Sequence, residues 1–223
     1  MTEPETEGIN LYSEKSLHIA LKQYIAQLGD RFEVEVDGFV ADIMRGEQII
    51  EIQTRNFSAM KRKLTKLLEV HQIRLVHPIP LERWIVKQGV SRRKSPKRGH
   101  VTHIFNELVY IYHLMQHPNF SLQVLLIRDE EIRVNDGQGS WRRKGWSIQD
   151  RRLLEVVESV TFQTVDDLKR LLPDDLPDTF TTANLAACLE QNQRVAQKMV
   201  YCLRHMEAIK QIGKKGRAYL YAR

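Results

Sequence analysis

Two short apolar segments that each contain an acidic residue constrain this chain most. They are residues 39–44, Phe-Val-Ala-Asp-Ile-Met, and residues 49–54, Ile-Ile-Glu-Ile-Gln-Thr, and Arg-Gly-Glu-Gln joins them. Apolar, β-branched runs around a short polar stretch with glycine predict a β-hairpin. Successive side chains of a strand point to opposite faces, so Glu51 and Gln53 share the face opposite to Ile52.

The two acids of this hairpin, Asp42 and Glu51, interrupt otherwise apolar strands. A carboxylate buried there costs several kcal/mol unless a cation or a metal ion partners it. Acids on adjacent strands can converge on one point, and oxygen ligands suit Mg²⁺ or Mn²⁺. The alternative is that Asp42, Glu51 and Gln53 line the solvent-exposed face of a two-sided sheet.

The segments around the hairpin predict alternating helices and strands. A helix is expected from Ser13 to Leu28 and another from Ser58 to His71, with one basic face on the second. Strands are expected at 32–36, 73–78, 83–87 and 122–127, and a further helix at about 101–115.

The order helix, strand, Asp-bearing strand, Glu-x-Gln strand, helix, strand resembles the core of the PD-(D/E)XK, or restriction-endonuclease-like, nuclease superfamily. Asp42 matches the Asp of that pattern and Glu51 its second acid, whereas Gln53 stands where most members have lysine. The resemblance covers about residues 12–88. It implies an α/β (α+β) protein with an αβββαβ core around a mixed sheet.

The same resemblance implies metal-dependent phosphodiester hydrolysis, with Mg²⁺ or Mn²⁺ as cofactor. Asp42 and Glu51 are the expected metal ligands, and Glu14 in the first helix is either a third ligand or a complement to the helix dipole. Gln53 can orient a water molecule but supplies no charge. Lys61 or Lys63 from the next helix can supply that charge instead, and we take Lys63 as the candidate.

The C-terminal stretch from Gln191 to Arg223 holds eight bases against the acid Glu207. Such a localised positive charge favours a polyanionic partner, nucleic acid first. Helices are expected at about 166–172, 183–189 and 194–206, with a turn at 190–193 that suits a helix-turn-helix. A hairpin with the basic tip Gly-Lys-Lys-Gly follows.

This order resembles a winged helix-turn-helix over about residues 161–223. The resemblance implies that the third helix enters the major groove of double-stranded DNA and that the hairpin lies on the flanking backbone. The candidate groove contacts are Gln193, Arg194, Gln197 and Lys198, and the candidate phosphate contacts are Lys214, Lys215 and Arg217. The alternative is a winged helix used for protein contacts.

Two further basic segments lie between these regions. Residues 91–100 predict an exposed loop, which either grips a phosphate backbone or is only a soluble insertion. Residues 136–146 predict a linker or a hairpin, whose Trp and Arg side chains either stack on bases or pack at a domain junction. A helix is expected at 149–158. The expected organisation is a flexible tail at 1–11, a nuclease-like domain at 12–135, a linker with a helix at 136–160 and the winged helix at 161–223.

Composition narrows the class of protein. The chain has no run of 18 apolar residues for a transmembrane helix, and its first residues are acidic rather than typical of a secretory signal. Cys188 and Cys202 lie in apolar helical patterns without metal-ligand spacing, which indicates a cytoplasmic protein without a membrane partner. A homodimer is compatible with double-strand cleavage.

Two functions are therefore expected from different classes. The first is a Mg²⁺-dependent endonuclease that its winged helix delivers to DNA. The second is a catalytically inactive DNA-binding regulator or structural protein that retains a nuclease fold. The acids Asp42 and Glu51 favour the first, and Gln53 favours the second.

Overall fold

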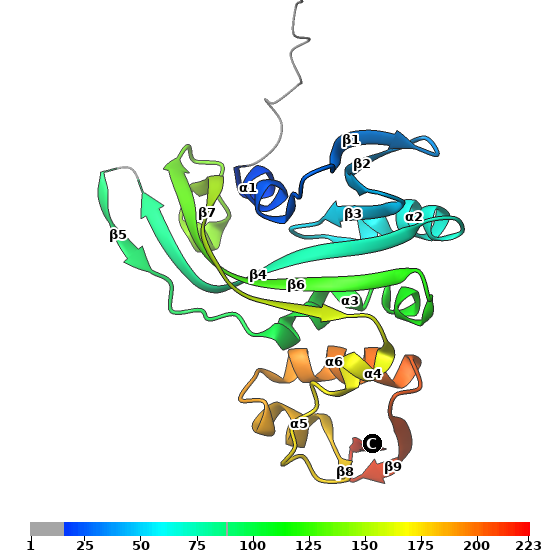
Figure 1. Ribbon diagram of the computed structural model, residues 1–223. Helices are drawn as coiled ribbons and strands as arrows, with labels where there is room; N and C mark the ends of the chain where they lie inside the picture. The colour runs from blue at the N-terminus through cyan, green and yellow to red at the C-terminus, as the bar shows by residue number, and fades with distance from the viewer. Residues whose placement is uncertain (1–15, 88) are drawn as a thin grey trace, which may run out of the picture.

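A seven-stranded mixed sheet forms the larger part of the fold, and a small three-stranded antiparallel sheet with helices follows it (Figure 1). The computed structural model describes residues 16–87 and 89–223. Over these residues the chain is a mixed α/β protein. The strand order of the large sheet is β1-β2-β3-β4-β6-β7, and β5 pairs with β4 outside this path.

The N-terminal part follows the order expected from the sequence. Its elements are α1 (Ser16–Ile25), β1 (Arg31–Val36), β2 (Phe39–Arg45), β3 (Gln48–Ile52), α2 (Phe57–Leu68) and β4 (Gln72–Lys87). The first three strands are antiparallel neighbours, and β4 lies parallel to β3. The helix α2 is the crossover that a parallel connection needs.

Three long strands extend the sheet beyond that core: β4, β6 (Phe120–Asn135) and β7 (Trp146–Phe162). The two strands predicted at 73–78 and 83–87 are one continuous strand, β4. The exposed loop predicted at 91–100 begins with strand β5 (Val90–Lys94), which pairs with the end of β4. Figure 1 shows these strands running side by side and curving upward, toward the side of α1, at the end that carries β5.

The helix predicted at 149–158 is wrong, whereas the hairpin alternative for 136–146 is confirmed, because this segment joins the antiparallel strands β6 and β7. After the short 3₁₀ turn η3 (Trp141–Arg143), these residues enter β7, which pairs with β6 along most of its length. The spacing of Leu153, Leu154 and Val157 fits a helix, but β-branched residues crowd the second half of this segment, and such residues prefer a pleated sheet. The pairing with β6 decides the outcome.

The helix predicted at 101–115 is broken into three short pieces. They are η1 (Val101–Ile104), α3 (Phe105–Leu108) and η2 (Tyr112–Gln116). The segment is rich in β-branched residues, among them Val109 and Ile111, which lose side-chain freedom in a helix. The apolar side chains that suggested a continuous helix are nevertheless buried, and they pack beneath the sheet.

The C-terminal part follows the predicted order of helices and hairpin. Its elements are α4 (Val165–Lys169), β8 (Thr179–Phe180), α5 (Thr182–Cys188), α6 (Gln193–His205), β9 (Lys210–Lys215) and β10 (Ala218–Ala222). Thr181 and Asn192 cap α5 and α6 by accepting hydrogen bonds from backbone N–H groups in the first turns. The strand order β8-β10-β9 closes the small sheet.

Hydrophobic clusters cover both faces of the large sheet. On one face α1 packs Leu17, Leu21 and Ile25 against isoleucines of β2 and β3. On the other face a single cluster runs from α2 and α3 into the C-terminal helices, where it includes Met199 and Leu203 of α6. The sheet and the C-terminal helices therefore share one apolar core, seen in Figure 1 as α6 lying beneath α3.

Among the described residues, no helix is long and apolar enough to cross a membrane.

Candidate functional site

The hairpin of β2 and β3 opens where its two acids lie. Its ladder runs from Arg45 opposite Gln48 to Ile43 opposite Ile50. In that register the next opposed positions are Asp42 and Glu51. There Asp42 Oδ2 accepts a hydrogen bond from the Ile52 N–H at 2.7 Å, so a side chain takes the place of a ladder bond. The site is therefore built where two strands separate.

Helix α1 supplies two basic side chains to Asp42. His18 Nε2 lies 3.3 Å from Asp42 Oδ2, and Lys22 Nζ lies 3.9 Å from Asp42 Oδ1. Lys22 also pairs with Glu33 of β1. Burial by itself raises the pKa of Asp42, but His18, the Ile52 N–H and Lys22 outweigh it and hold that pKa below 3.8. Asp42 is therefore ionised at neutral pH.

Helix α2 supplies a cation to Glu51. Lys63 Nζ lies 2.6 Å from Glu51 Oε2 and donates a second hydrogen bond to the Val40 carbonyl at 2.5 Å. The side chain of Glu51 is only 3% exposed, and its other oxygen, Oε1, is buried without a hydrogen-bond partner among the described residues. Burial, and then the charge of Asp42, raise the pKa of Glu51 to about 7 in spite of Lys63.

Gln53 lies apart from this pair of acids. It follows the last residue of β3, and its side-chain Nε2 donates to the Asn56 carbonyl at 3.2 Å. The buried His77 donates from Nδ1 to the Gln53 carbonyl at 2.6 Å, and burial lowers the pKa of His77, which keeps the ring neutral. The structure thus brings together Asp42, Glu51 and Lys63, while Gln53 belongs to the loop before α2.

The donor set suits a hard cation. An unpartnered buried carboxylate oxygen beside a second ionised carboxylate offers the oxygen ligands that Mg²⁺ and Mn²⁺ take. Among residues 16–87 and 89–223, no group of three or more His, Cys, Asp or Glu side chains is arranged to hold a metal. Glu14, the predicted third ligand, lies outside the described residues.

His18 and Lys22 are site residues that were not predicted from the sequence. Besides Asp42, His18 Nε2 contacts the Ile52 carbonyl oxygen at 3.1 Å. The available signal was the spacing of His18 and Lys22, because residues four apart share one face of a helix. Two bases on the helix face beside an apolar stripe are poorly explained by solvent exposure alone, and here both reach the Asp42 carboxylate.

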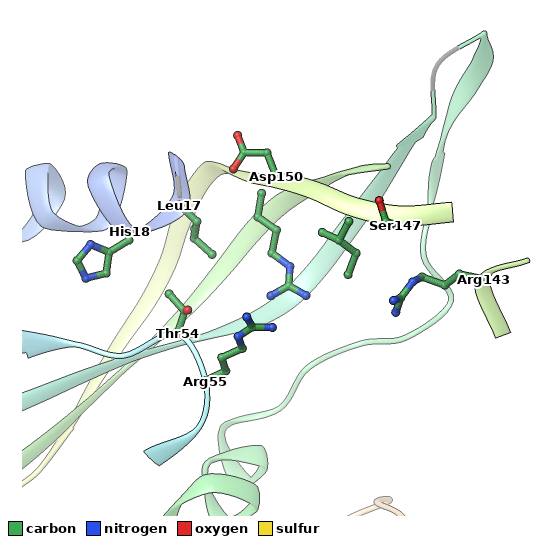
Figure 2. A pocket seen from close by; sticks show the side chains of 9 residues that line it. Leu17, His18, Thr54, Arg55, Arg143, Ser147 and Asp150 are labelled. Atoms are coloured by element: carbon green, nitrogen blue, oxygen red, sulfur yellow. The ribbon is translucent and has the colours of Figure 1, made fainter. Parts of the chain in front are cut away.

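A pocket of about 270 Å³ lies beside His18. Figure 2 shows Arg55, from the loop after β3, and Arg143, from the segment before β7, approaching it from different sides. Its lining residues are Leu17, His18, Thr54, Arg55, Arg143, Ser147, Ile148, Asp150 and Arg151. Three arginines of this lining face a single acid, Asp150, and His18 lies both in the pocket wall and against Asp42.

The predicted nucleic-acid contacts of the C-terminal part fall into two sets. Gln193, Gln197 and Arg217 line a groove of about 590 Å³ between α6 and the β9–β10 hairpin, while Arg194, Lys214 and Lys215 are exposed nearby. Lys198 instead donates to the Asn106 carbonyl at 3.3 Å, on the side of α6 that packs against α3.

Comparison with known proteins places the chain in a family. It belongs to the family described as a domain of unknown function, DUF8091, whose model matches residues 15–163. An uncharacterized protein of Treponema pallidum (strain Nichols) is 37% identical over 184 residues, which cover 80% of this chain and 73% of that protein. No solved structure matches the chain. The family match ends just after β7 and includes the whole hairpin site.

Proposed function

We propose that this protein is a metal-dependent nuclease that acts on DNA, with its active site at Asp42, Glu51 and Lys63. The observation that carries the proposal is the carboxylate of Glu51, which is buried beside a second acid with one oxygen unpartnered. The element order α1-β1-β2-β3-α2-β4 and the parallel pairing of β3 with β4 support a PD-(D/E)XK-like core.

Each residue of the site has a chemical role in this proposal. Asp42 and Glu51 hold Mg²⁺ or Mn²⁺, which when bound polarises a phosphoryl oxygen and lowers the pKa of a water molecule. Lys63 reaches Glu51 from α2 and provides the positive charge that Gln53 lacks. His18 and Lys22 hold Asp42 ionised at neutral pH.

The C-terminal part supports a DNA partner. Its order of helices, turn and basic hairpin is that of a winged helix-turn-helix, with α6 as the helix that enters the major groove. Gln193, Gln197 and Arg217 line the protein groove between α6 and the β9–β10 hairpin. The exposed Lys214 and Lys215 are placed to contact phosphates, so this part recruits duplex DNA to the nuclease site.

A second function is favoured by the Glu51–Lys63 contact. An ammonium group 2.6 Å from the carboxylate already balances the buried charge without a metal. In that case the pair is structural, and the protein is a catalytically inactive DNA-binding regulator. If the protein is a nuclease, removing the carboxylate charge abolishes DNA cleavage. If it is the regulator, the same change alters only the stability of the fold.

Cleavage of supercoiled plasmid in Mg²⁺ or Mn²⁺ separates these functions. We expect nicking by the wild type and none by Asp42→Asn or Glu51→Gln. Glu47→Gln is the matched control, because Glu47 is exposed in the turn of the same hairpin. A gel shift in EDTA with the same samples measures binding. Binding by all four proteins without nicking by any of them selects the regulator.

A further inference from the structure

A long basic groove leads away from the hairpin site along the extended strands. Its largest part, about 890 Å³, lies on β4, β6 and β7 between two flanking segments, residues 95–99 and 140–143. The pocket of Figure 2 adjoins it and shares Arg143, Ile148 and Arg151 with it. A third pocket of about 240 Å³ shares Arg151 with both. Together we call these three the arginine groove.

Charge along the arginine groove is strongly positive. Its acidic lining residues are Glu107, Glu131 and Asp150. Its basic lining residues are Arg55, Arg83, Arg93, Lys97, Arg98, Arg133, Arg142, Arg143 and Arg151. Nine bases against three acids in one concave surface attract a polyanion far more than scattered surface charges do.

The strand arginines of the groove are held in place by buried acids. Arg83 makes a two-pronged contact with the fully buried Asp129, at 2.8 and 2.5 Å. Arg83, Arg133 and Arg151 all contact the buried Glu131, at 3.1, 2.6 and 3.2 Å. Guanidinium groups fixed in this way lose little freedom when they bind a phosphate.

Four bases of the groove, on β5 and on the flanking segments, are available to a ligand. Among the residues that the structure describes, Arg93, Lys97, Arg142 and Arg143 have no acid within ion-pair distance. Bases that lack an acidic partner are the groups whose counterions a phosphate backbone displaces.

Both flanking segments are fixed to the sheet rather than loose. A Cβ atom at Gly99 would lie 2.3 Å from the Pro80 carbonyl oxygen, and one at Gly139 would lie 2.0 Å from that of Trp146. Only glycine allows these close approaches. Most residues of the predicted loop at 91–100 are exposed, as expected, and β5 and the close approach of Gly99 hold the segment against β4.

An aromatic side chain stands in the same lining. Trp141 is 82% exposed, which is unusual for so large an apolar group, and Arg142 lies over its ring at 5.4 Å. Exposed aromatic rings in positively charged grooves stack on unpaired bases. Bases within a duplex are already stacked on each other, so a single strand is the form that offers its base faces to Trp141.

We propose that the arginine groove binds single-stranded nucleic acid, with its phosphates on the arginines and a base on Trp141. The strand leads to the hairpin site, because His18 lies both in the groove lining and against Asp42. Only the fate of the strand rests on the proposed nuclease function; binding in the groove does not require cleavage.

Fluorescence anisotropy with a labelled oligodeoxythymidine 20-mer in EDTA tests the inference, with the duplex of equal length for comparison. The groove variant is Lys97→Ser with Arg142→Ser. The matched control is Arg31→Ser with Arg152→Ser, which removes the same charge from exposed positions outside the groove. A third variant, Trp141→Ala, is compared with Trp141→Phe, which retains an aromatic ring.

We expect the groove variant to weaken single-strand binding at least about 10-fold and to reduce the salt dependence of log K by about 1.4, while the control stays near the wild type. Trp141→Ala should weaken it by about 5- to 100-fold, and Trp141→Phe should restore most of the affinity. The inference is overturned if the groove and control variants weaken single-strand binding equally. It is also overturned if the wild type binds the duplex more tightly than the single strand and only the groove variant loses that duplex binding. Groove binding without plasmid nicking contradicts the nuclease proposal and leaves this inference standing.

Discussion

Two basic surfaces of this molecule differ in how the chain builds them. The bases of the β9–β10 hairpin, Lys214, Lys215 and Arg217, are neighbours in the sequence. Those of the arginine groove come from segments as distant as Arg55 and Arg151, which only the sheet brings together. A run of charge reveals the first surface directly, whereas the second exists only once β4, β6 and β7 are paired.

The two surfaces also differ in what fixes them. Strand arginines of the groove are anchored by Asp129 and Glu131, which are both buried. The bases of the β9–β10 hairpin are exposed, and Lys214 Nζ lies over the ring of Tyr219, 5.1 Å from its centroid. We infer that the groove is a preorganised surface and that the hairpin adjusts to its partner.

The largest expected effect separates catalysis at the β2–β3 site from DNA binding by the two basic surfaces. Glu51→Gln should reduce metal-dependent cleavage by at least about 10²–10³-fold, because it removes the buried charge on which the proposed metal site depends. Binding of single-stranded and duplex DNA in EDTA should stay within about twofold of the wild type. A parallel loss of binding would mean that the substitution disturbs the fold rather than the chemistry.

The next effect tests the anchoring of the groove. Glu131→Ala leaves Arg83, Arg133 and Arg151 without a shared acid, and we expect a loss of about 3–5 kcal/mol in the free energy of unfolding. Urea titration followed by circular dichroism measures it. Glu155→Ala is the control: its pair with Arg128 is exposed, so the expected loss is below about 1 kcal/mol. Equal losses would mean that Glu131 holds the groove arginines no more firmly than an exposed ion pair does.

A pH dependence follows from the pKa of Glu51, which is about 7 in the folded protein against an ordinary value of 4.5. Between these values the folded state binds more protons than the unfolded state, so this group makes stability fall as the pH rises. Without metal, the wild type should lose stability relative to Glu51→Gln from about pH 4.5 to about pH 7, and the difference should level off above that. Urea titrations of both proteins across this range measure it, and a constant difference would contradict the raised pKa.

The smallest expected effect concerns the bases of the β9–β10 hairpin. Lys214→Ser with Lys215→Ser should lower duplex affinity about 10-fold and reduce the salt dependence of log K by about 1.8, if both contact phosphates. Single-strand affinity should stay unchanged. Anisotropy with both oligonucleotides measures this. Loss of single-strand binding in this variant would mean that both oligonucleotides bind the β9–β10 hairpin, which would contradict separate roles for the two surfaces.

The β2–β3 hairpin could be predicted from the sequence because the signals for it are local. Alternating apolar residues and the turn at Gly46 each act within a few residues, and the structure retains them. The long-range features were not predictable in that way. The strand β7 was expected to be a helix, since only its pairing with β6 settles its conformation.

The candidate site was predicted in part for the same reason. Asp42 and Glu51 stand out as acids in apolar strands, which is visible in the sequence. Their neighbours come from other elements: His18 and Lys22 from α1, and Lys63 from α2. Lys63 was a candidate because α2 follows directly, but nothing in the sequence shows that His18 reaches Asp42.

Single-turnover cleavage of circular single-stranded DNA in Mn²⁺ tests the central claim most directly, because it joins the groove to the hairpin site. The wild type and Glu51→Gln are compared at protein concentrations that saturate binding in EDTA. The account predicts linear product from the wild type and none from the variant, although both bind. Saturated binding without product from the wild type, or equal product from both proteins, would contradict it.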